Sequence, residues 1–281
     1  MKKLSYFILT KGIGLYLNGL SYIKPEQAKR KAYTLFSTPR KGRLKSDRLP
    51  RTLLYTTKES FTYKNETIQT YHWAGDATIV LLVHGWESNS SRWKKMLPHL
   101  KTLGHTIIAV DAPAHGLSGG REFNAPKYAE YLNVISQKYA PSIVIGHSIG
   151  GAALAFYLNK YKNPSVEKVV FLGAPSQFKL LSDNFIALLS LNKRIKGLLE
   201  AYYQKRFAIP INDFAGHKFA ANFTQKAIIA HDVKDKIVPV TEGQLYAEAW
   251  KDAIYIETRG LGHSMHDEHL YRKIIAFLKE V

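Results

Sequence analysis

The sequence predicts an α/β fold, in which a mostly parallel sheet carries helices on both faces. Short, almost wholly apolar runs recur along the chain, and such runs are typical of strands that are buried on both sides. Stretches with helical periodicity alternate with these runs, as strand–helix–strand crossovers require. The composition, with 46% hydrophobic and 22% charged residues in 281, excludes a disordered or fibrous chain.

The predicted elements follow one another in a regular order. Residues 61–75 alternate around two turn signals and predict an antiparallel hairpin. Buried strands are then predicted at 78–85, 106–113, 142–148, 166–175, 226–232 and 253–258. Helices are predicted at 90–103, 124–139, 149–161, 241–251 and 267–280. A long insertion at about 176–224 breaks this order, and an insertion of that size is typical of a functional lid, so we expect an inserted helical cap.

The basic residues are concentrated near the start of the chain. The sequence has 40 Lys and Arg against 22 Asp and Glu, a formal net charge of +18. Residues 1–52 hold 13 basic and 2 acidic residues, which is 13 − 2 = +11. We therefore predict a basic N-terminal helical extension and linker at 1–52, followed by an α/β domain at 53–281 that includes the cap.

An apolar stretch at 4–23 opens the extension. Lys11 interrupts it and no small-x-small cleavage site follows, so a cleaved signal is not expected. A membrane span would place Lys11 in the bilayer at a cost of about 3 kcal/mol. The pattern favours a helix packed on the edge of the domain, with a solvated basic segment after it. The alternative is a helix on an anionic membrane surface, helped by the basic run 24–51. We expect a cytoplasmic protein, peripheral to the membrane in the second case.

Several function classes are excluded or disfavoured. The chain has no cysteine, which excludes a disulfide framework, a thiolate metal site and a cysteine nucleophile. The basic residues show no recognition helix or stacking platform, so we expect no nucleic-acid partner. His263, His266 and His269 repeat every three residues, but no carboxylate–histidine motif supports a metal site. We predict neither a metal nor an organic cofactor.

The sharpest motif is "IVIGHSIGG" at 143–151, a buried strand that runs into Gly-x-Ser-x-Gly and an alanine-rich helix. Such a turn holds its serine in strained backbone geometry, and small residues two before and two after the serine avoid clashes. The hydroxyl is then exposed at the carboxyl end of the strand, beside a helix N-terminus. Ser148 is therefore the candidate nucleophile. The alternative is an ordinary strand-to-helix turn with a capping serine.

A serine nucleophile needs a base and an orienting acid. Neutral imidazole is the natural base near pH 7. Among eleven histidines, His263 fits best, because it follows the last predicted strand in a glycine-rich loop. His147 is expected to point away from the hydroxyl. The acid should be a carboxylate at a strand end, and Asp232 and Asp235 both follow the strand at 226–232.

From about residue 60 onward, the chain resembles the α/β-hydrolase fold family. The matching segments, in the family's order, are "LLVHGWES" (81–88), "DAPAHGLS" (111–118), "GHSIGG" (146–151), "HDVKDKIVP" (231–239) and "GLGHSMHD" (260–267). The resemblance implies that these are the oxyanion loop, a glycine-rich loop, the nucleophile elbow, the acid loop and the histidine loop. It favours Asp235 over Asp232, because "IVP" follows Asp235. The triad would then be Ser148, Asp235 and His263.

The resemblance implies a serine hydrolase that acts on a small-molecule acyl substrate, most commonly a carboxylic ester, through an acyl-enzyme. Its oxyanion hole would use the backbone N–H groups of Trp86 and Ile149. Phe178, Phe185 and Leu189 in the cap are candidates for binding an apolar acyl group, although the same spacing serves equally for packing. Thioesterase, peptidase, carbon–carbon hydrolase or lyase chemistry remains open, as does a non-catalytic protein that binds a membrane surface.

Overall fold

The computed structural model describes residues 2–280, with side chains from residue 4 onward. The chain forms two compact units. The larger unit contains Pro39–Ser176 and the chain from Gly216 on, and the smaller unit contains the chain up to Thr38 together with Gln177–Ala215. The insertion expected at about 176–224 thus falls partly into each unit.

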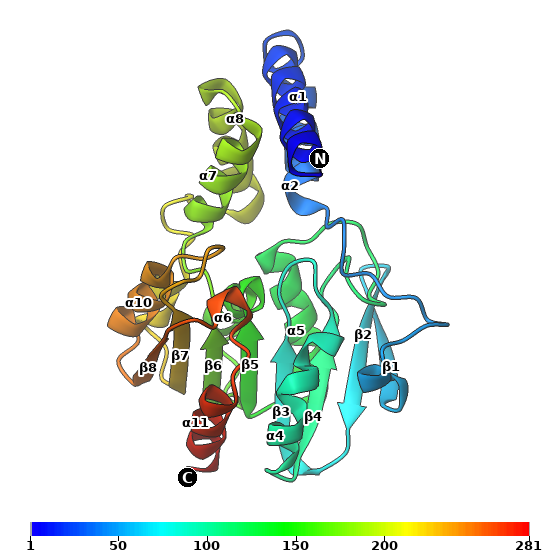
Figure 1. The fold of residues 1–281 in the computed structure, drawn as a ribbon, viewed down its shortest axis with the longest axis vertical. Coiled ribbons are helices and arrows are strands. Elements are labelled where there is room, and N and C mark those ends of the chain that lie inside the picture. The colour runs from blue at the N-terminus through cyan, green and yellow to red at the C-terminus, as the bar shows by residue number, and fades with distance from the viewer. Residues whose placement is uncertain (1, 281) are drawn as a thin grey trace. The chain divides into compact units, whose positions relative to one another are not determined.

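An eight-stranded sheet forms the centre of the larger unit (Figure 1). Its strands are β1 (Thr57–Tyr63), β2 (Glu66–Trp73), β3 (Asp76–Val83), β4 (His105–Val110), β5 (Ile143–His147), β6 (Lys168–Leu172), β7 (Lys226–Asp232) and β8 (Ala253–Thr258). They lie in the order β1-β2-β4-β3-β5-β6-β7-β8. The pairs β1–β2 and β2–β4 are antiparallel and the others are parallel. The predicted α/β class is confirmed, and the predicted hairpin corresponds to β1 and β2.

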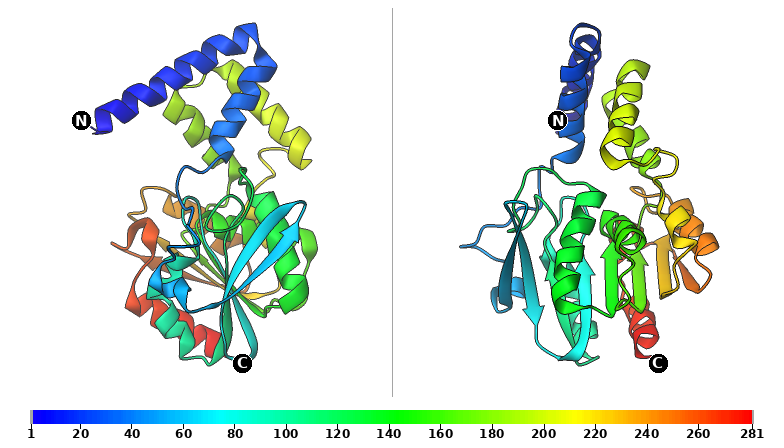
Figure 2. Two further views of the ribbon diagram at one scale, coloured as in Figure 1. Left: turned by 90° about the vertical axis from the view of Figure 1, so that its right-hand side faces the viewer. Right: turned by 180° about the vertical axis from the view of Figure 1, so that it is seen from behind.

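Helices cover both faces of this sheet. The helices of the larger unit are α3 (Arg51–Leu54), η1 (Ser90–Lys95), α4 (Leu97–Lys101), α5 (Ala125–Tyr139), α6 (Ile149–Tyr161), α9 (Gly216–Ala220), α10 (Val240–Ala249), η2 (Gly262–Ser264) and α11 (Glu268–Lys279). Helices α5 and α6 pack together on one face, and α4 and α11 pack together on the other (Figure 2). The single helix predicted at 90–103 is wrong, because it divides at Met96 into η1 and α4. Pro98 has no N–H to donate and suits only the first turn of a helix.

The central strands β3 to β7 are mostly apolar because most of their length is buried on both faces. Val80 and Leu82 of β3, Ile145 of β5 and Val170 of β6 are fully buried in one cluster with side chains of α4 and α11. This packing fixes the carboxyl ends of the parallel strands at one edge of the sheet. Loops that follow these strands therefore converge there.

The smaller unit consists of four helices from distant parts of the sequence, namely α1 (Lys2–Ile23), α2 (Pro25–Ser37), α7 (Phe178–Leu189) and α8 (Lys193–Phe207). Residues 25–37, expected in a solvated basic segment, form a helix instead. Pro25 suits its first turn, and Ala28, Ala32 and Tyr33 recur at helical spacing and are buried. No helix of the part that the structure describes is both long and apolar enough to cross a bilayer.

Candidate active site

Ser148 lies on the turn between β5 and α6, with an unusual backbone conformation. Its φ is 55° and its ψ is −133°, a region that non-glycine residues rarely adopt. Glycine is required around it: a Cβ on Gly146 would approach Gly151 Cα to 2.7 Å, and a Cβ on Gly150 would approach the Val83 carbonyl oxygen to 2.4 Å. The spacing of the glycines in the motif thus follows from the close approach of α6 to β5 and β3.

The three residues predicted as a triad are brought together at the carboxyl edge of the sheet. Ser148 follows β5, Asp235 follows β7, and His263 follows β8 in η2. The hydroxyl of Ser148 lies 2.9 Å from Nε2 of His263, and Nδ1 of His263 lies 2.7 Å from Oδ2 of Asp235. The imidazole therefore accepts from the hydroxyl on one side and donates to the carboxylate on the other. This is the geometry of a serine nucleophile with its base and orienting acid.

Asp235 is fully buried, yet its surroundings favour the ionised carboxylate. Its Oδ1 accepts from the N–H groups of Ile237 (2.8 Å) and Val238 (3.0 Å). Burial by itself would raise the pKa of Asp235, but hydrogen bonding to His231 and His263 and to these N–H groups holds the pKa well below its ordinary value. A carboxylate that stays charged can stabilise an imidazolium at His263.

Asp232 has a different set of partners. Its Oδ1 accepts from the N–H of Lys234 at 2.9 Å, and its Oδ2 accepts from the hydroxyl of Thr258 (2.9 Å) and the N–H of Leu261 (2.8 Å). These contacts connect the loop after β7 with the loop after β8, which carries His263. Asp232 therefore braces the two loops, whereas Asp235 contacts the ring.

The turn that contains Trp86 passes directly beside Ser148. A Cβ on Gly85 would lie 2.8 Å from Cβ of Ser148, so only glycine fits there. No hydrogen bond among the described residues uses the N–H of Trp86 or of Ile149. The two N–H groups predicted for an oxyanion hole are thus free to donate to an oxygen of a bound substrate.

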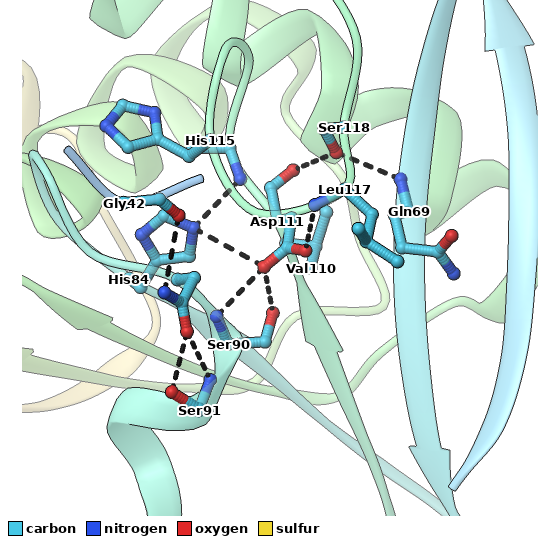
Figure 3. Close-up of polar contacts among 12 residues, drawn as sticks. Gly42, Gln69, His84, Ser90, Ser91, Val110, Asp111, His115, Leu117 and Ser118 are labelled. Carbon is cyan, nitrogen blue, oxygen red and sulfur yellow. Dashed lines mark hydrogen bonds and ion pairs between the residues drawn. The ribbon is translucent and has the colours of Figure 1, made fainter. Parts of the chain in front are cut away.

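Asp111 organises the loops behind this turn (Figure 3). Its fully buried carboxylate accepts from the N–H and the hydroxyl of Ser90 (2.9 and 2.7 Å), the N–H of Leu117 (2.9 Å) and the hydroxyl of Tyr71 (2.9 Å). Burial raises the pKa of Asp111, and these donors oppose the rise. Four hydrogen bonds to one carboxylate join β2, η1 and the 111–118 loop into one support.

Two buried histidines hold the turn that contains Trp86 to the same support. Nε2 of His84 accepts from the N–H of Ala112 (3.0 Å), and Nε2 of His115 accepts from the N–H of Glu87 (2.9 Å). The other ring nitrogen of each donates to a backbone carbonyl. Because a backbone N–H can only donate, both rings are neutral, and burial lowers the pKa of each to about 4. The turn that carries Trp86 is held from both sides.

Two further histidines lie at the site: sequence reasoning expected His147 only to point away from the hydroxyl, and it did not single out His231. Nε2 of His147 donates to the carbonyl oxygen of His263 at 2.7 Å, and the two rings lie 4.9 Å apart. Nε2 of His231 lies 3.0 Å from the carbonyl oxygen of Val238 and 3.5 Å from Oδ2 of Asp235. Both are polar residues at the end of an otherwise apolar strand, and that was the signal that could have identified them.

The remaining candidates lie elsewhere. Leu189 is buried in the core of the smaller unit, and Phe178 and Phe185 pack against that core, each with its ring near Phe36. The structure thus uses these three cap residues for packing within their own unit. In the histidine repeat after β8, His266 contacts the hydroxyl of Tyr271. No group of three potential metal ligands occurs within the described part of the chain.

A sequence profile described as the alpha/beta hydrolase fold matches residues 78–221, just over half of the 281 residues. The bifunctional esterase/perhydrolase DCH of Acinetobacter calcoaceticus is 29% identical over 108 residues, which cover 35% of this chain and 37% of that protein. Protein ABHD8 of Homo sapiens is 24% identical over 214 residues, which cover 60% of this chain and 47% of that protein. The chain thus spans about half or less of the length of these curated relatives.

Among solved structures, the bromoperoxidase of Bacillus anthracis superposes with a TM-score of 0.62 and 19% sequence identity, covering 80% of this chain and 100% of that one. At this level of identity, the likeness concerns the fold. It agrees with the sheet order and the helix layers described above.

Proposed function

This chain belongs to the alpha/beta hydrolase fold family, and from that premise we propose that it is a serine hydrolase that cleaves a carboxylic ester through an acyl-enzyme. The observation that carries the proposal is the hydrogen-bonded series Ser148–His263–Asp235 on a strained elbow. The named esterase activity of the Acinetobacter relative supports an ester as the first substrate class to test.

The proposed reaction begins at Ser148. Its oxygen attacks the ester carbonyl carbon while Nε2 of His263 takes the hydroxyl proton. The carbonyl oxygen becomes an oxyanion that accepts hydrogen bonds from the N–H groups of Trp86 and Ile149. Asp235, held ionised in its buried site, stabilises the imidazolium that forms at His263.

Collapse of this first intermediate breaks the bond to the alcohol. His263 returns the proton to the leaving oxygen, the alcohol departs, and the acyl group remains on Ser148. Water then attacks the acyl-enzyme, with His263 acting as base again, and the carboxylic acid leaves. His263 then returns the proton that it took from water to the oxygen of Ser148 as the acyl bond to that oxygen breaks, so the same triad and the same oxyanion donors serve both halves.

Labelling and turnover of a single serine variant test this proposal. Ser148→Ala should abolish labelling by a fluorophosphonate probe and lower kcat on a p-nitrophenyl ester by about 10⁴ or more, with the fold intact by circular dichroism. Ser165→Ala is a matched control. Ser165 precedes β6 at the opposite edge of the sheet, where its hydroxyl contacts Pro141 and Asn163, so kcat should not change.

The substrate class is tested with the wild type, and Ser148→Ala serves as the inactive control. Esters of graded acyl length, a thioester and an amide are offered to the wild type, and kcat/KM should be highest for an ester. If the probe labels Ser148 but kcat/KM is highest for a thioester or an amide, Ser148 remains the nucleophile and the ester is replaced as the proposed substrate class. A folded Ser148→Ala protein with unchanged turnover would refute the nucleophile itself.

A further inference from the structure

Helix α1 presents an unusually apolar surface to solvent. Of the fourteen large apolar side chains that are exposed among the described residues, nine lie on this helix. They are Leu4, Tyr6, Phe7, Ile8, Leu9, Leu15, Tyr16, Tyr22 and Ile23, and each is between 54% and 78% exposed. Isolated exposed apolar residues are ordinary, but a contiguous set on one element marks an interaction surface.

The opposite side of α1 holds the helix in the smaller unit. Leu17 is 1% exposed, and Gly14 lies so close to the Leu189 carbonyl that no Cβ would fit. Nζ of Lys11 donates to the hydroxyl of Ser190 (2.7 Å), and Nδ2 of Asn18 donates to its carbonyl (2.9 Å). The single charge between residues 4 and 23 lies beside Ile8 and Leu15 on the helix, but its ammonium group is used in the contact with Ser190 at the end of α7.

Ile8, Leu15 and Tyr22 lie on the exposed side of α1, which we call the outer face. They are seven residues apart, so they fall on one line along a helix with 3.6 residues per turn. On that helix, they lie on the side opposite Leu17. Both sides of α1 are therefore apolar, one buried against α7 and α8 and the other exposed.

A groove of about 460 Å³ lies between α1 and α2. Ile13, Leu17 and Leu35 supply its apolar lining, and Arg30 and Lys31 lie beside them. Tyr16 lines this groove and is one of the exposed apolar side chains of α1, and Nζ of Lys31 lies 5.9 Å from the centre of its ring. Neither Arg30 nor Lys31 forms an ion pair within the described residues. Apolar surface and unpaired cations are thus adjacent on one unit.

We propose that helix α1 binds to the surface of an anionic membrane, with its outer face among the upper acyl chains and with Arg30 and Lys31 at the lipid headgroups. Charge selects this partner. Residues 1–38 hold seven basic and one acidic residue, which is 7 − 1 = +6, so a second copy of the chain would bring repelling charge, whereas anionic lipids attract it. Tyr16 and Tyr22 suit the boundary between water and acyl chains. The helix lies in the interface and does not span the bilayer. The proposal does not depend on the hydrolase activity.

Flotation of the full chain with vesicles tests the proposal. The wild type should bind vesicles of phosphatidylcholine mixed with phosphatidylglycerol, bind pure phosphatidylcholine much less, and release as salt is raised. Ile8→Glu with Leu15→Glu should weaken binding by at least about tenfold, because two apolar side chains are lost from the interface. The matched control is Leu54→Glu with Ile254→Glu, which changes two exposed apolar residues of the larger unit by the same charge and should bind at nearly wild-type strength.

Two further readouts keep the result interpretable. Circular dichroism of each variant checks that the helices persist. The double variant Arg30→Gln with Lys31→Gln should bind anionic vesicles with less preference over neutral ones, but it should still bind through its apolar side chains. Equal vesicle binding by the wild type and the Ile8→Glu, Leu15→Glu variant would overturn the proposal. So would a wild type that ignores anionic vesicles but dimerises in light scattering through the same two residues, since the outer face would then belong to a second copy.

Discussion

Two carboxylates follow strand β7 three residues apart, and their hydrogen-bond partners separate their roles. Asp235 contacts the imidazole of His263 at 2.7 Å, while Asp232 accepts from backbone N–H groups and from Thr258. Both are ionised and both stabilise loops at the site. Only Asp235 can stabilise positive charge that forms on the ring during a reaction.

Exchange of each carboxylate for its amide should therefore have unequal effects. Asp235→Asn keeps the volume but removes the charge and favours the wrong tautomer of His263, so kcat on an activated ester should fall at least about a hundredfold. Asp232→Asn changes contacts to the loop backbone and should lower kcat less than about tenfold. Measuring kcat for both variants on one ester decides the assignment. If Asp232→Asn loses most of its kcat while Asp235→Asn stays near the wild type, Asp232 is the acid of the triad.

At the scale of elements, the site depends on how closely α6 approaches the strands beside it. Gly150 begins the first turn of α6, and its Cα faces the last carbonyls of β3 and of His84. Those carbonyls belong to the segment that leads to Trp86. A change at one helix position therefore reaches the proposed oxyanion donor through backbone contact alone.

Gly150→Ala should lower both the free energy of unfolding and kcat. The new Cβ would lie 2.4 Å from the Val83 carbonyl oxygen and 2.6 Å from that of His84, and backbone atoms cannot move aside cheaply. We expect about 1–3 kcal/mol of destabilisation in urea unfolding and a loss of kcat of about tenfold or more. Gly197→Ala is the control, because Gly197 lies on the exposed side of α8 and nothing lies within 4 Å of an added Cβ, so this change should stabilise by about 0.5–1 kcal/mol. Wild-type stability and turnover in Gly150→Ala would show that the turn has room to adjust.

At the scale of the whole molecule, the chain has two cores. The core of the larger unit is built from the strands and the helices that cover them. That of the smaller unit joins α1 and α2 to α7 and α8, across the 140 residues between Ser37 and Phe178, and contains Leu17, Tyr33 and Leu189. The N-terminal helices are thus structural partners of the insertion.

Removal of residues 1–23 should loosen the insertion selectively. Without α1, Leu189 and the end of α7 lose their cover, so amide hydrogen exchange within 178–207 should accelerate. Exchange in β3, β5 and β6 should stay slow, because their core is separate. Leu15→Glu, on the outer face of the same helix, should leave both patterns unchanged. Equal protection of 178–207 with and without residues 1–23 would mean that α7 and α8 hold together without α1.

The sequence by itself determined the class of the fold, the approximate positions of the strands and the position of the candidate nucleophile. These features depend on local patterns. A buried strand is apolar along its own length, and the strained turn at Ser148 requires glycine only two residues away on either side. His263 and the pair Asp232 and Asp235 could be named because they follow predicted strands, and the family resemblance then favoured Asp235.

Only the tertiary structure decided which residues meet across long separations. The sequence does not encode the distance between Asp235 and His263, the contact of His147 with the His263 carbonyl, or the burial of one side of helix 25–37. A basic, amphipathic stretch has the same periodicity whether its apolar side meets water or another helix. The outcome depends on what the rest of the chain places beside it, and here that neighbour is the insertion at 177–215.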